Sequence, residues 1–186
     1  MTDTNKIQLI KIDQLLAIVT DCPSQRLIDL LPYLNEVMVK YDITSKARIA
    51  HFIAQTAHES DGFNTNEEYA TGSDYEGRGD LGNTQTGDGV RFKGRGLIQV
   101  TGRTNYFECG RALNVDLIAN PEKLSTNEYA ALSAGWFWDK NNLNKIADDM
   151  SLSSDETCTQ ITKIVNGGYN GLDARLGYLN RAMSVL

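Results

Sequence analysis

The chain has 186 residues, of which 41% are hydrophobic and 23% are charged, and its formal net charge at pH 7 is −6. This length suits a single domain with a sizeable core. The acidic balance, with no Lys/Arg cluster longer than two residues, argues against a nucleic-acid-binding protein. The three cysteines, Cys22, Cys109 and Cys158, are too few and too widely spaced for a disulfide framework, so we expect buried free thiols in a protein made in a reducing compartment.

The first 43 residues predict a helical lead-in. Residues 1–19 are rich in Ile and Leu, but Asp13 and Gln14 interrupt the run and no small-residue cleavage site follows, so the segment does not have the usual form of a secretory signal. No apolar run is long enough to span a bilayer. Residues 24–41 carry a helical stripe of leucines, in which Pro32 is expected to break or kink the helix.

A third helix is predicted to begin at Thr44 as its N-cap and to end at about Ser60. The chain then changes character, because Gly62 is followed by nine further glycines up to Gly102. This composition predicts irregular chain with tight turns, or a small β-hairpin. An irregular segment this long in a compact domain is typically functional. Helices are expected again over residues 129–138, which should be buried, and over residues 155–165 and 172–186.

Two glutamates stand where the third helix gives way to the glycine-rich segment. Glycoside hydrolysis commonly uses two carboxyl groups that flank one bond. Glu59 follows apolar helix, and partial burial would favour its protonated form, whereas Glu68 lies among polar residues and should stay ionised. A straight helix would place them about 13–14 Å apart, so the helix must end near Gly62 for Glu68 to turn back across a cleft. Two glutamates at a helix end are, however, equally typical of an exposed surface.

Other candidate residues have structural alternatives. His51 and His58 lie seven residues apart, but the second histidine of a zinc-protease motif is missing, and we expect no metal site and no cofactor. Trp136 and Trp138 fit a core better than a sugar platform. The tyrosines of the glycine-rich segment are the better candidates for stacking on sugar rings; they are Tyr69, Tyr75 and Tyr106.

Several motifs follow one another in a fixed order. They are residues 50–60 (AHFIAQTAHES), 75–84 (YEGRGDLGNT), 92–106 (FKGRGLIQVTGRTNY), 119–121 (ANP), 136–138 (WFW) and 164–168 (IVNGG). The first resembles the acid-bearing helix of family 19 glycoside hydrolases, which include plant-type chitinases and many phage endolysins. The second is similar to a segment of bacterial and phage members, and the third closely resembles the core motif of the family. The resemblance covers residues 44–186.

The resemblance implies roles for individual residues. Glu59 matches the general acid and Glu68 the general base, with Glu67 as a competitor because this loop varies in length across the family. Thr101 matches a hydroxyl residue that helps to hold the attacking water. The residues that match sugar-binding positions, or are candidates to contact sugar rings, are Gln99, Asn105, Tyr106, Asn166, Tyr69 and Arg175.

Three of these assignments carry a reservation from the sequence itself. Gln99 and Asn105 would also serve simply to satisfy loop backbone, since buried polar groups usually do so. Arg175 matches an arginine near the acid, which in plant enzymes also pairs with a further glutamate. Asn170 stands at that position here, so the network is incomplete.

The sequence therefore predicts one mainly α, α+β lysozyme-like domain over residues 1–186, with two lobes, a central cleft and the irregular or hairpin segment. The lead-in is 1–43 and the motif-bearing region 44–186. The chain is short and lacks the disulfides of the plant enzymes, which points to an endolysin. Such an enzyme would cleave β-1,4 bonds of bacterial peptidoglycan with inversion at the anomeric carbon. We expect a monomer that accumulates in the host cytoplasm, is released to the periplasm and wall by a holin, and neither binds nucleic acid nor inserts stably into a membrane. The alternatives are a chitinase acting on chitin, or an inactive sugar-binding or structural phage protein with the same fold.

Overall fold

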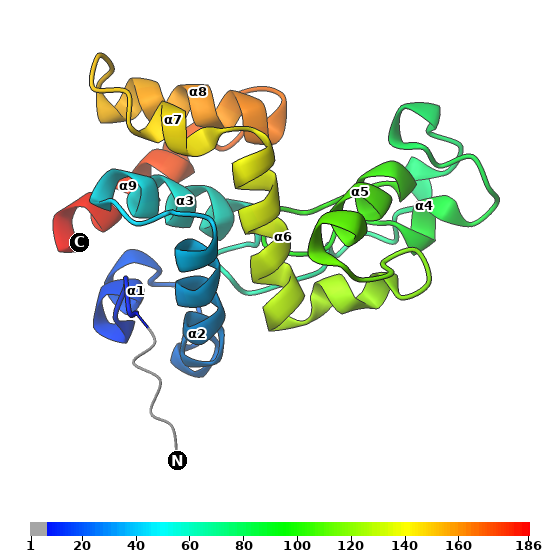
Figure 1. Ribbon diagram of the computed structural model, residues 1–186, viewed down its shortest axis with the longest axis horizontal. Coiled ribbons are helices and arrows are strands. Elements are labelled where there is room, and N and C mark those ends of the chain that lie inside the picture. Colours follow the sequence, from blue (N-terminus) through cyan, green and yellow to red (C-terminus); the bar gives the residue numbers. More distant parts are fainter. Residues whose placement is uncertain (1–6) are drawn as a thin grey trace.

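The computed structural model describes residues 7–186, so the first six residues of the predicted lead-in lie outside the described residues (Figure 1). The helices are α1 (Ile12–Ile18), α2 (Ser24–Lys40), α3 (Lys46–Glu59), α4 (Asp88–Arg91), α5 (Arg103–Leu113), α6 (Asn127–Lys140), α7 (Leu143–Ala147), α8 (Ser154–Asn166) and α9 (Leu172–Val185). Short 3-10 helices cover Ser73–Tyr75, Gly79–Leu81 and Pro121–Ser125. None of the helices within residues 7–186 has the length and apolar character needed to cross a membrane.

The helices form two groups on either side of α6 (Figure 1). One group holds α1, α2, α3, α7, α8 and α9, and α3 packs extensively against α9. The glycine-rich segment, α4 and α5 extend away on the other side. This arrangement confirms the predicted mostly helical fold with two lobes. The predicted hairpin is reduced to two isolated bridges, which pair Arg95 with Glu67 and with Val100.

Local interactions at each end of α3 determine where this helix begins and where it stops. Ser45, not Thr44, is the N-cap, because its hydroxyl accepts a hydrogen bond from the Arg48 N–H at 3.2 Å. The expected cap was wrong by one residue, and the Thr44 hydroxyl donates instead to Asp42 at 3.1 Å. At the other end the helix stops at Glu59, as the sequence predicted to within one residue.

The chain turns sharply after α3. Three consecutive residues, Asp61, Gly62 and Phe63, have positive φ angles of 53°, 65° and 64°, which no helix can continue through. The Ser60 hydroxyl donates to the Thr56 carbonyl at 2.6 Å and accepts from the Phe63 N–H at 3.2 Å, so it supports the turn. The glutamates at 59 and 68 are therefore not separated by the length of a straight helix.

The structure corrects the expectation of a break in α2 and adds the helix α5. Pro32 does not break α2, which runs unbroken from Ser24 to Lys40; the missing N–H of the proline costs only one helical hydrogen bond. The helix α5 was not expected, because its buried residues are only Tyr106, Cys109 and Gly110, which make a weak apolar stripe.

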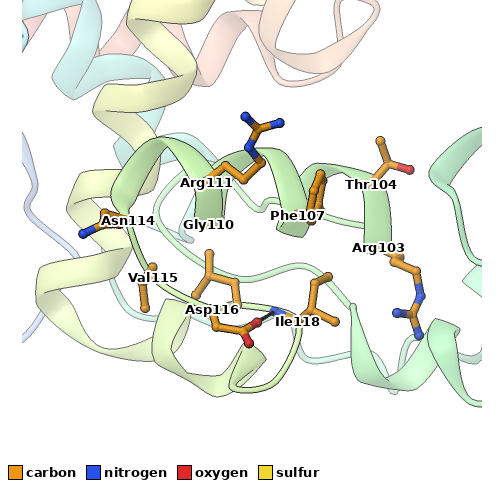
Figure 2. A pocket seen from close by; sticks show the side chains of 10 residues that line it. Arg103, Thr104, Phe107, Gly110, Arg111, Asn114, Val115, Asp116 and Ile118 are labelled. Carbon is orange, nitrogen blue, oxygen red and sulfur yellow. Dashed lines mark hydrogen bonds between the residues drawn. The ribbon is translucent and has the colours of Figure 1, made fainter.

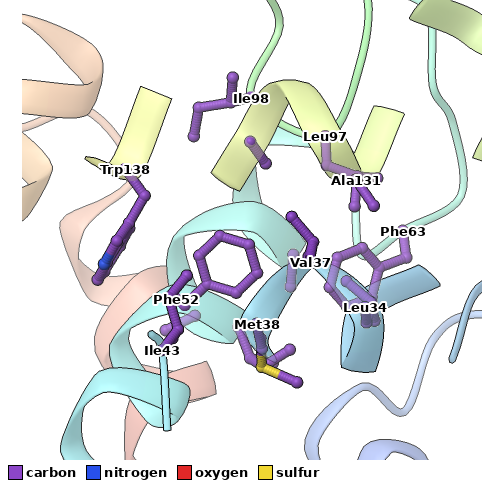
Figure 3. Packing of buried hydrophobic residues seen from close by; sticks show 14 of the residues in the cluster. Leu34, Val37, Met38, Ile43, Phe52, Phe63, Leu97, Ile98, Ala131 and Trp138 are labelled. Atoms are coloured by element: carbon purple, nitrogen blue, oxygen red, sulfur yellow. The ribbon is translucent and has the colours of Figure 1, made fainter. Parts of the chain in front are cut away.

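The core of the larger group joins α2, α3 and α6 (Figure 3). Phe52 meets the ring of Trp138 edge-on, with centroids 5.4 Å apart and an interplanar angle of 87°. Trp138 is 1% exposed and Trp136 is 9% exposed, which confirms that both tryptophans belong to the core rather than to a sugar platform. The three cysteines are buried and free, as predicted.

Gly135 determines how closely α6 approaches α2. A Cβ atom at this position would lie 2.4 Å from a methyl carbon of Val37 and 2.3 Å from the Tyr41 ring. Both distances are far below van der Waals contact, so the glycine is required by packing and not by backbone conformation. Gly177, within α9, is different, because its nearest neighbour would be the end of the Arg181 side chain at 3.6 Å.

We predict opposite effects of alanine at these two helical glycines. Gly135→Ala should lower the free energy of unfolding by roughly 1–3 kcal/mol, because the added methyl overpacks the contact with α2. Gly177→Ala should raise it by roughly 0.5–1 kcal/mol, because it removes backbone freedom from the unfolded chain without a clash. Urea unfolding of both variants measures the two changes. A Gly135→Ala variant as stable as the parent protein would contradict the described α2–α6 contact.

Candidate active site

The first group of site residues consists of Glu59, Gln55 and Arg175, and Arg175 lies at its centre. Its side chain is 0% exposed, and its guanidinium pairs with the carboxylate of Glu59 through Nη2 and Oε1. Nη1 donates to Oε1 of Gln55 at 2.5 Å, and Nε donates to the backbone carbonyl of Asn170 at 3.4 Å. Asn170 thus contributes its backbone at the place where the sequence indicated a missing carboxylate. The arginine is satisfied by one charge and two neutral acceptors.

Gln55 is a site residue that the sequence analysis missed. It is fully buried, and besides accepting from Arg175 it donates through Nε2 to the Thr162 hydroxyl at 3.0 Å. The amide therefore connects α3 with α8 and α9. The only sequence signal was a polar residue on the apolar face of a predicted helix, one turn before Glu59.

Glu59 is partly buried, as the sequence predicted, because its side chain is 16% exposed. The adjacent guanidinium is that of Arg175, the residue that the sequence comparison matched to an arginine near the acid. Arg175 engages Oε1, and no other hydrogen bond to the Glu59 carboxyl group is found within residues 7–186. Oε2 is thus free of protein partners there.

The two histidines of α3 do not add charge to this group. Burial, helped by the positive charge of Arg175 and opposed by Glu59, lowers the pKa of His58. Burial alone lowers the pKa of His51 to about 4, and its Nδ1 atom has no hydrogen-bond partner. Both rings are therefore neutral at pH 7. The described part of the chain holds no cluster of three His, Cys, Asp or Glu side chains arranged to bind a metal ion.

The second group of site residues consists of Glu68, Gln99 and Thr101 around Gly94, and its environment is different. Oε1 of Glu68 accepts from the Gly94 N–H at 2.7 Å, and its Oε2 accepts from the Tyr75 hydroxyl at 3.0 Å. Its own N–H donates to the Gly94 carbonyl at 3.0 Å. With one donor on each carboxylate oxygen, the orientation of the side chain is fixed.

Gly94 brings three of the predicted residues together. A Cβ atom there would lie 2.8 Å from Oε1 of Gln99, 3.3 Å from Oγ1 of Thr101 and 3.4 Å from Cδ of Glu68. The three side chains therefore surround the space that a larger residue would fill. Gln99 reaches this place through a positive φ of 55°, and its Nε2 donates to the Gly96 carbonyl at 2.9 Å.

The remaining predicted polar residues differ in their placement. Asn105 donates to the Thr101 carbonyl at 2.8 Å, which supports the structural alternative for this residue while keeping it beside the second group. Asn166 is exposed at the end of α8. Tyr69 is 78% exposed and donates to Asp61 at 2.9 Å. Within residues 7–186, no hydrogen bond joins Asn166 or Tyr69 to Glu59 or Glu68.

The prediction that Tyr106 contacts sugar is wrong. The residue is 0% exposed, and its ring meets Phe92 at a centroid distance of 5.2 Å. Its hydroxyl donates to the Lys93 carbonyl at 2.6 Å and accepts from Arg95 at 3.0 Å. Burial raises the pKa of the phenol despite the neighbouring Arg95 charge. A ring that is enclosed on all sides cannot stack on a ligand, so Tyr106 supports the loop instead.

Glu67 is paired with two cations. Lys93 Nζ lies 2.7 Å from Oε1, Arg95 Nε lies 3.4 Å from Oε2, and the Ser125 hydroxyl donates to Oε2 at 2.9 Å. Burial opposes ionisation of this carboxyl, but the Lys93 and Ser125 hydrogen bonds and the Arg95 charge outweigh it, so the pKa is lowered. The two adjacent glutamates thus have separate sets of partners.

Comparisons with known proteins agree with this architecture. The sequence model of a glycoside hydrolase family described as chitinase class I matches residues 38–181. The chain is 32% identical over 168 residues to an acidic endochitinase of Petunia hybrida, with 78% of this chain and 64% of that protein covered. It is 31% identical over 178 residues to a glycosyl hydrolase family 19 domain-containing protein of Haemophilus influenzae, with 78% and 83% covered. The fold is similar to that of a class IV chitinase from Zea mays, with a TM-score of 0.69, 20% identity and coverage of 96% and 92%. The chain spans less than two thirds of the petunia protein.

We predict that the two adjacent glutamates differ in what their loss affects. Glu68→Gln should lower glycoside hydrolase turnover by at least about 10²-fold, because Glu68, beside Thr101, is the candidate proton acceptor. Glu67→Gln should instead lower the free energy of unfolding by roughly 1 kcal/mol, because it removes the negative charge that balances the buried guanidinium of Arg95. Turnover numbers and urea unfolding of both variants separate the two effects.

Azide provides a control for this assignment. A small anion can replace the activated water, so added azide should restore part of the turnover of the Glu68 variant and leave the Glu67 variant unchanged. If Glu67→Gln is the variant with the larger loss of turnover, the base assignment moves to Glu67.

Proposed function

The chain belongs to glycoside hydrolase family 19, the chitinase class I family of glycosidases, and from this premise we propose that it cleaves β-1,4 bonds of bacterial peptidoglycan by an inverting mechanism. The observation that carries the mechanism is the contrast between the two carboxyl groups. One carboxylate oxygen of Glu59 accepts a hydrogen bond from the buried guanidinium of Arg175, and the other has no partner within residues 7–186. Glu68, which lies beside Thr101 and Gln99, instead accepts a hydrogen bond on each of its two oxygens.

In this proposal Glu59 is the general acid and gives a proton from its free oxygen to the glycosidic oxygen. As the proton leaves, negative charge grows on the Glu59 carboxyl group. Arg175 is already in place to stabilise that charge, because its guanidinium contacts Oε1. An interaction that strengthens as the reaction proceeds lowers the barrier rather than merely binding the substrate. In this proposal the ion pair therefore assists proton transfer.

Glu68 is the general base in the same step. It takes a proton from a water molecule that also contacts the Thr101 hydroxyl, and this water attacks the anomeric carbon from the face opposite the leaving group. Gln99, with Asn105, Asn166 and Tyr69 as further candidates, would contact sugar hydroxyl or N-acetyl groups. The scheme requires no covalent intermediate and no cofactor.

Peptidoglycan is proposed as the substrate for two reasons. Residues 75–84 resemble a segment of bacterial and phage family members, and the chain covers 83% of a bacterial relative but only 64% of a plant endochitinase. The proposed role is that of an endolysin. It would be a monomeric enzyme in which residues 1–186 form one catalytic domain, made in the host cytoplasm and released by a holin to act on the wall and lyse the cell.

Hydrolysis of chitin is the second candidate function. The plant relatives are named endochitinases, and chitin presents the same β-1,4-linked N-acetylglucosamine without the lactyl and peptide carboxylates of peptidoglycan. The two substrates thus differ mainly in charge and in the bulk at alternate sugars.

One experiment compares the parent protein and Glu59→Gln on purified peptidoglycan and on colloidal chitin. The parent should clear the turbidity of wall fragments, and Glu59→Gln should reduce the rate by at least about 10²-fold, a usual contribution of a general acid. Glu122→Gln, at an exposed glutamate, is the matched control and should retain the parent rate.

The outcomes separate the candidates. Release of reducing ends from chitin alone would establish the second candidate. No cleavage of either polymer would favour an inactive sugar-binding protein. A Glu59→Gln variant that folds normally and keeps turnover within a factor of about three would contradict the assignment of the acid.

A further inference from the structure

A groove of about 880 Å³ lies along one face of α5, outside both groups of site residues (Figure 2). Thr104, Phe107, Arg111 and Asn114 line it from the helix, and residues 115–118 line it from the following loop. The helical residues recur at intervals of three or four, so they share one side of α5. Asn105, which contacts Thr101 beside Glu68, is directed to the opposite side, about 200° away from Phe107.

The base of the groove is built by a close approach of the loop to the helix. A Cβ atom at Gly110 would lie 2.6 Å from the Val115 carbonyl oxygen and 3.3 Å from Cβ of Leu117. The absence of a side chain at this position lets the loop lie against α5, with Leu117 buried and Ile118 partly buried. The resulting base is apolar, while the rim carries polar side chains.

The rim combines an exposed aromatic ring with a free cation. Phe107 is 51% exposed, and the Arg111 guanidinium lies over its ring at 5.8 Å from the centroid. In the part of the chain that the structure describes, no carboxylate pairs with Arg111. Thr104 and Asn114 are exposed, and no side-chain hydrogen bond is formed by either within residues 7–186.

The other charged residues of the groove are already engaged. Arg103 pairs with the buried carboxylate of Asp88 at 2.5 Å. Asp116 turns its Oδ1 towards backbone, where it accepts from the N–H groups of Ile118 and Ala119 at 3.0 and 2.9 Å. Arg111 is therefore the cation that remains available to a ligand, in a protein whose net charge is −6.

We propose that this groove is a second glycan-binding site, which holds a strand of amino-sugar polysaccharide bearing carboxylates. The apolar face of a sugar ring would lie on Phe107 and the base of the groove. The guanidinium of Arg111 would bind a carboxylate, for which its planar set of donors is well suited. Thr104 and Asn114, about 15 Å apart along the helix, would bond to hydroxyl or N-acetyl groups. The carboxylate-bearing polymer rests on the proposed function, in which peptidoglycan is the substrate.

Such a site would act by tethering. The polymer is insoluble and long, so a strand bound at α5 keeps neighbouring strands at a high local concentration near Glu59 and Glu68. A short soluble oligosaccharide gains nothing from the tether, because it cannot occupy both sites. The groove should therefore affect binding and turnover on intact wall but not turnover of a short substrate.

The test measures sedimentation of the catalytically inactive Glu59→Gln chain with insoluble peptidoglycan and with chitin. Arg111→Gln in this background should weaken binding to peptidoglycan by roughly fivefold, an effect that high salt removes, and should leave binding to uncharged chitin unchanged. Phe107→Ala should weaken binding to both polymers by roughly tenfold, through the loss of stacking. The matched controls are Ile28→Ala and Lys46→Gln, which remove an exposed apolar side chain and an exposed cation elsewhere and should bind as the parent does.

The same groove substitutions in the active chain should leave turnover of a short soluble oligosaccharide unchanged. Groove variants that bind peptidoglycan as tightly as the two controls would overturn the proposal. A loss of short-substrate turnover would also overturn it, because the groove would then belong to the catalytic site. If the active chain fails to cleave peptidoglycan while Arg111→Gln still weakens binding to it, the proposed function fails and the second site stands.

Discussion

The burial of Arg175 is the constraint on which the rest of the site depends. A guanidinium that is 0% exposed costs several kcal/mol unless its charge and its donors are matched. Glu59 and Gln55, one turn apart on α3, supply the match, and Thr162 on α8 orients the glutamine. The packing of three helices and the position of Glu59, the proposed acid, are thus determined by the same arginine. A catalytic carboxyl held on a rigid helix is better positioned than one on a loop.

The position of Glu68, the proposed base, depends on a different kind of constraint. Glu68 is held by irregular chain, and its orientation comes from the backbone N–H of Gly94 and from the Tyr75 hydroxyl. Loop backbone can serve as a rigid frame here because buried side chains fasten it, with Tyr106 bonded to the Lys93 carbonyl. The site therefore combines a helical half, whose stability comes from a buried charge, with a loop half, whose shape comes from glycines and from the side chains packed beneath them.

Much of this could be predicted from sequence, and the failures have a common physical cause. The ends of α3 follow from local chemistry, so its extent was predicted to within about one residue of either end. The role of Gln55 was not predictable, because its partner Arg175 lies 120 residues away and no local pattern reveals such a contact. Tyr106 was assigned to the surface because glycine-rich chain is usually exposed, whereas contacts with Phe92 and Arg95 bury it. Local sequence signals predict helices and turns, but whether a side chain such as Tyr106 on α5 is buried depends on tertiary contacts.

The central claim is that Glu59 and Glu68 act as acid and base on opposite faces of one bond, so that water displaces the leaving group in a single step. Proton NMR of the first product formed from a soluble β-linked amino-sugar oligosaccharide tests it most directly, because the anomeric signal distinguishes the two configurations before mutarotation. The account predicts that the new reducing end first appears as the α anomer, the result of inversion. A product that first appears as the β anomer would mean that configuration is retained, and a covalent or substrate-assisted mechanism would have to replace the one described.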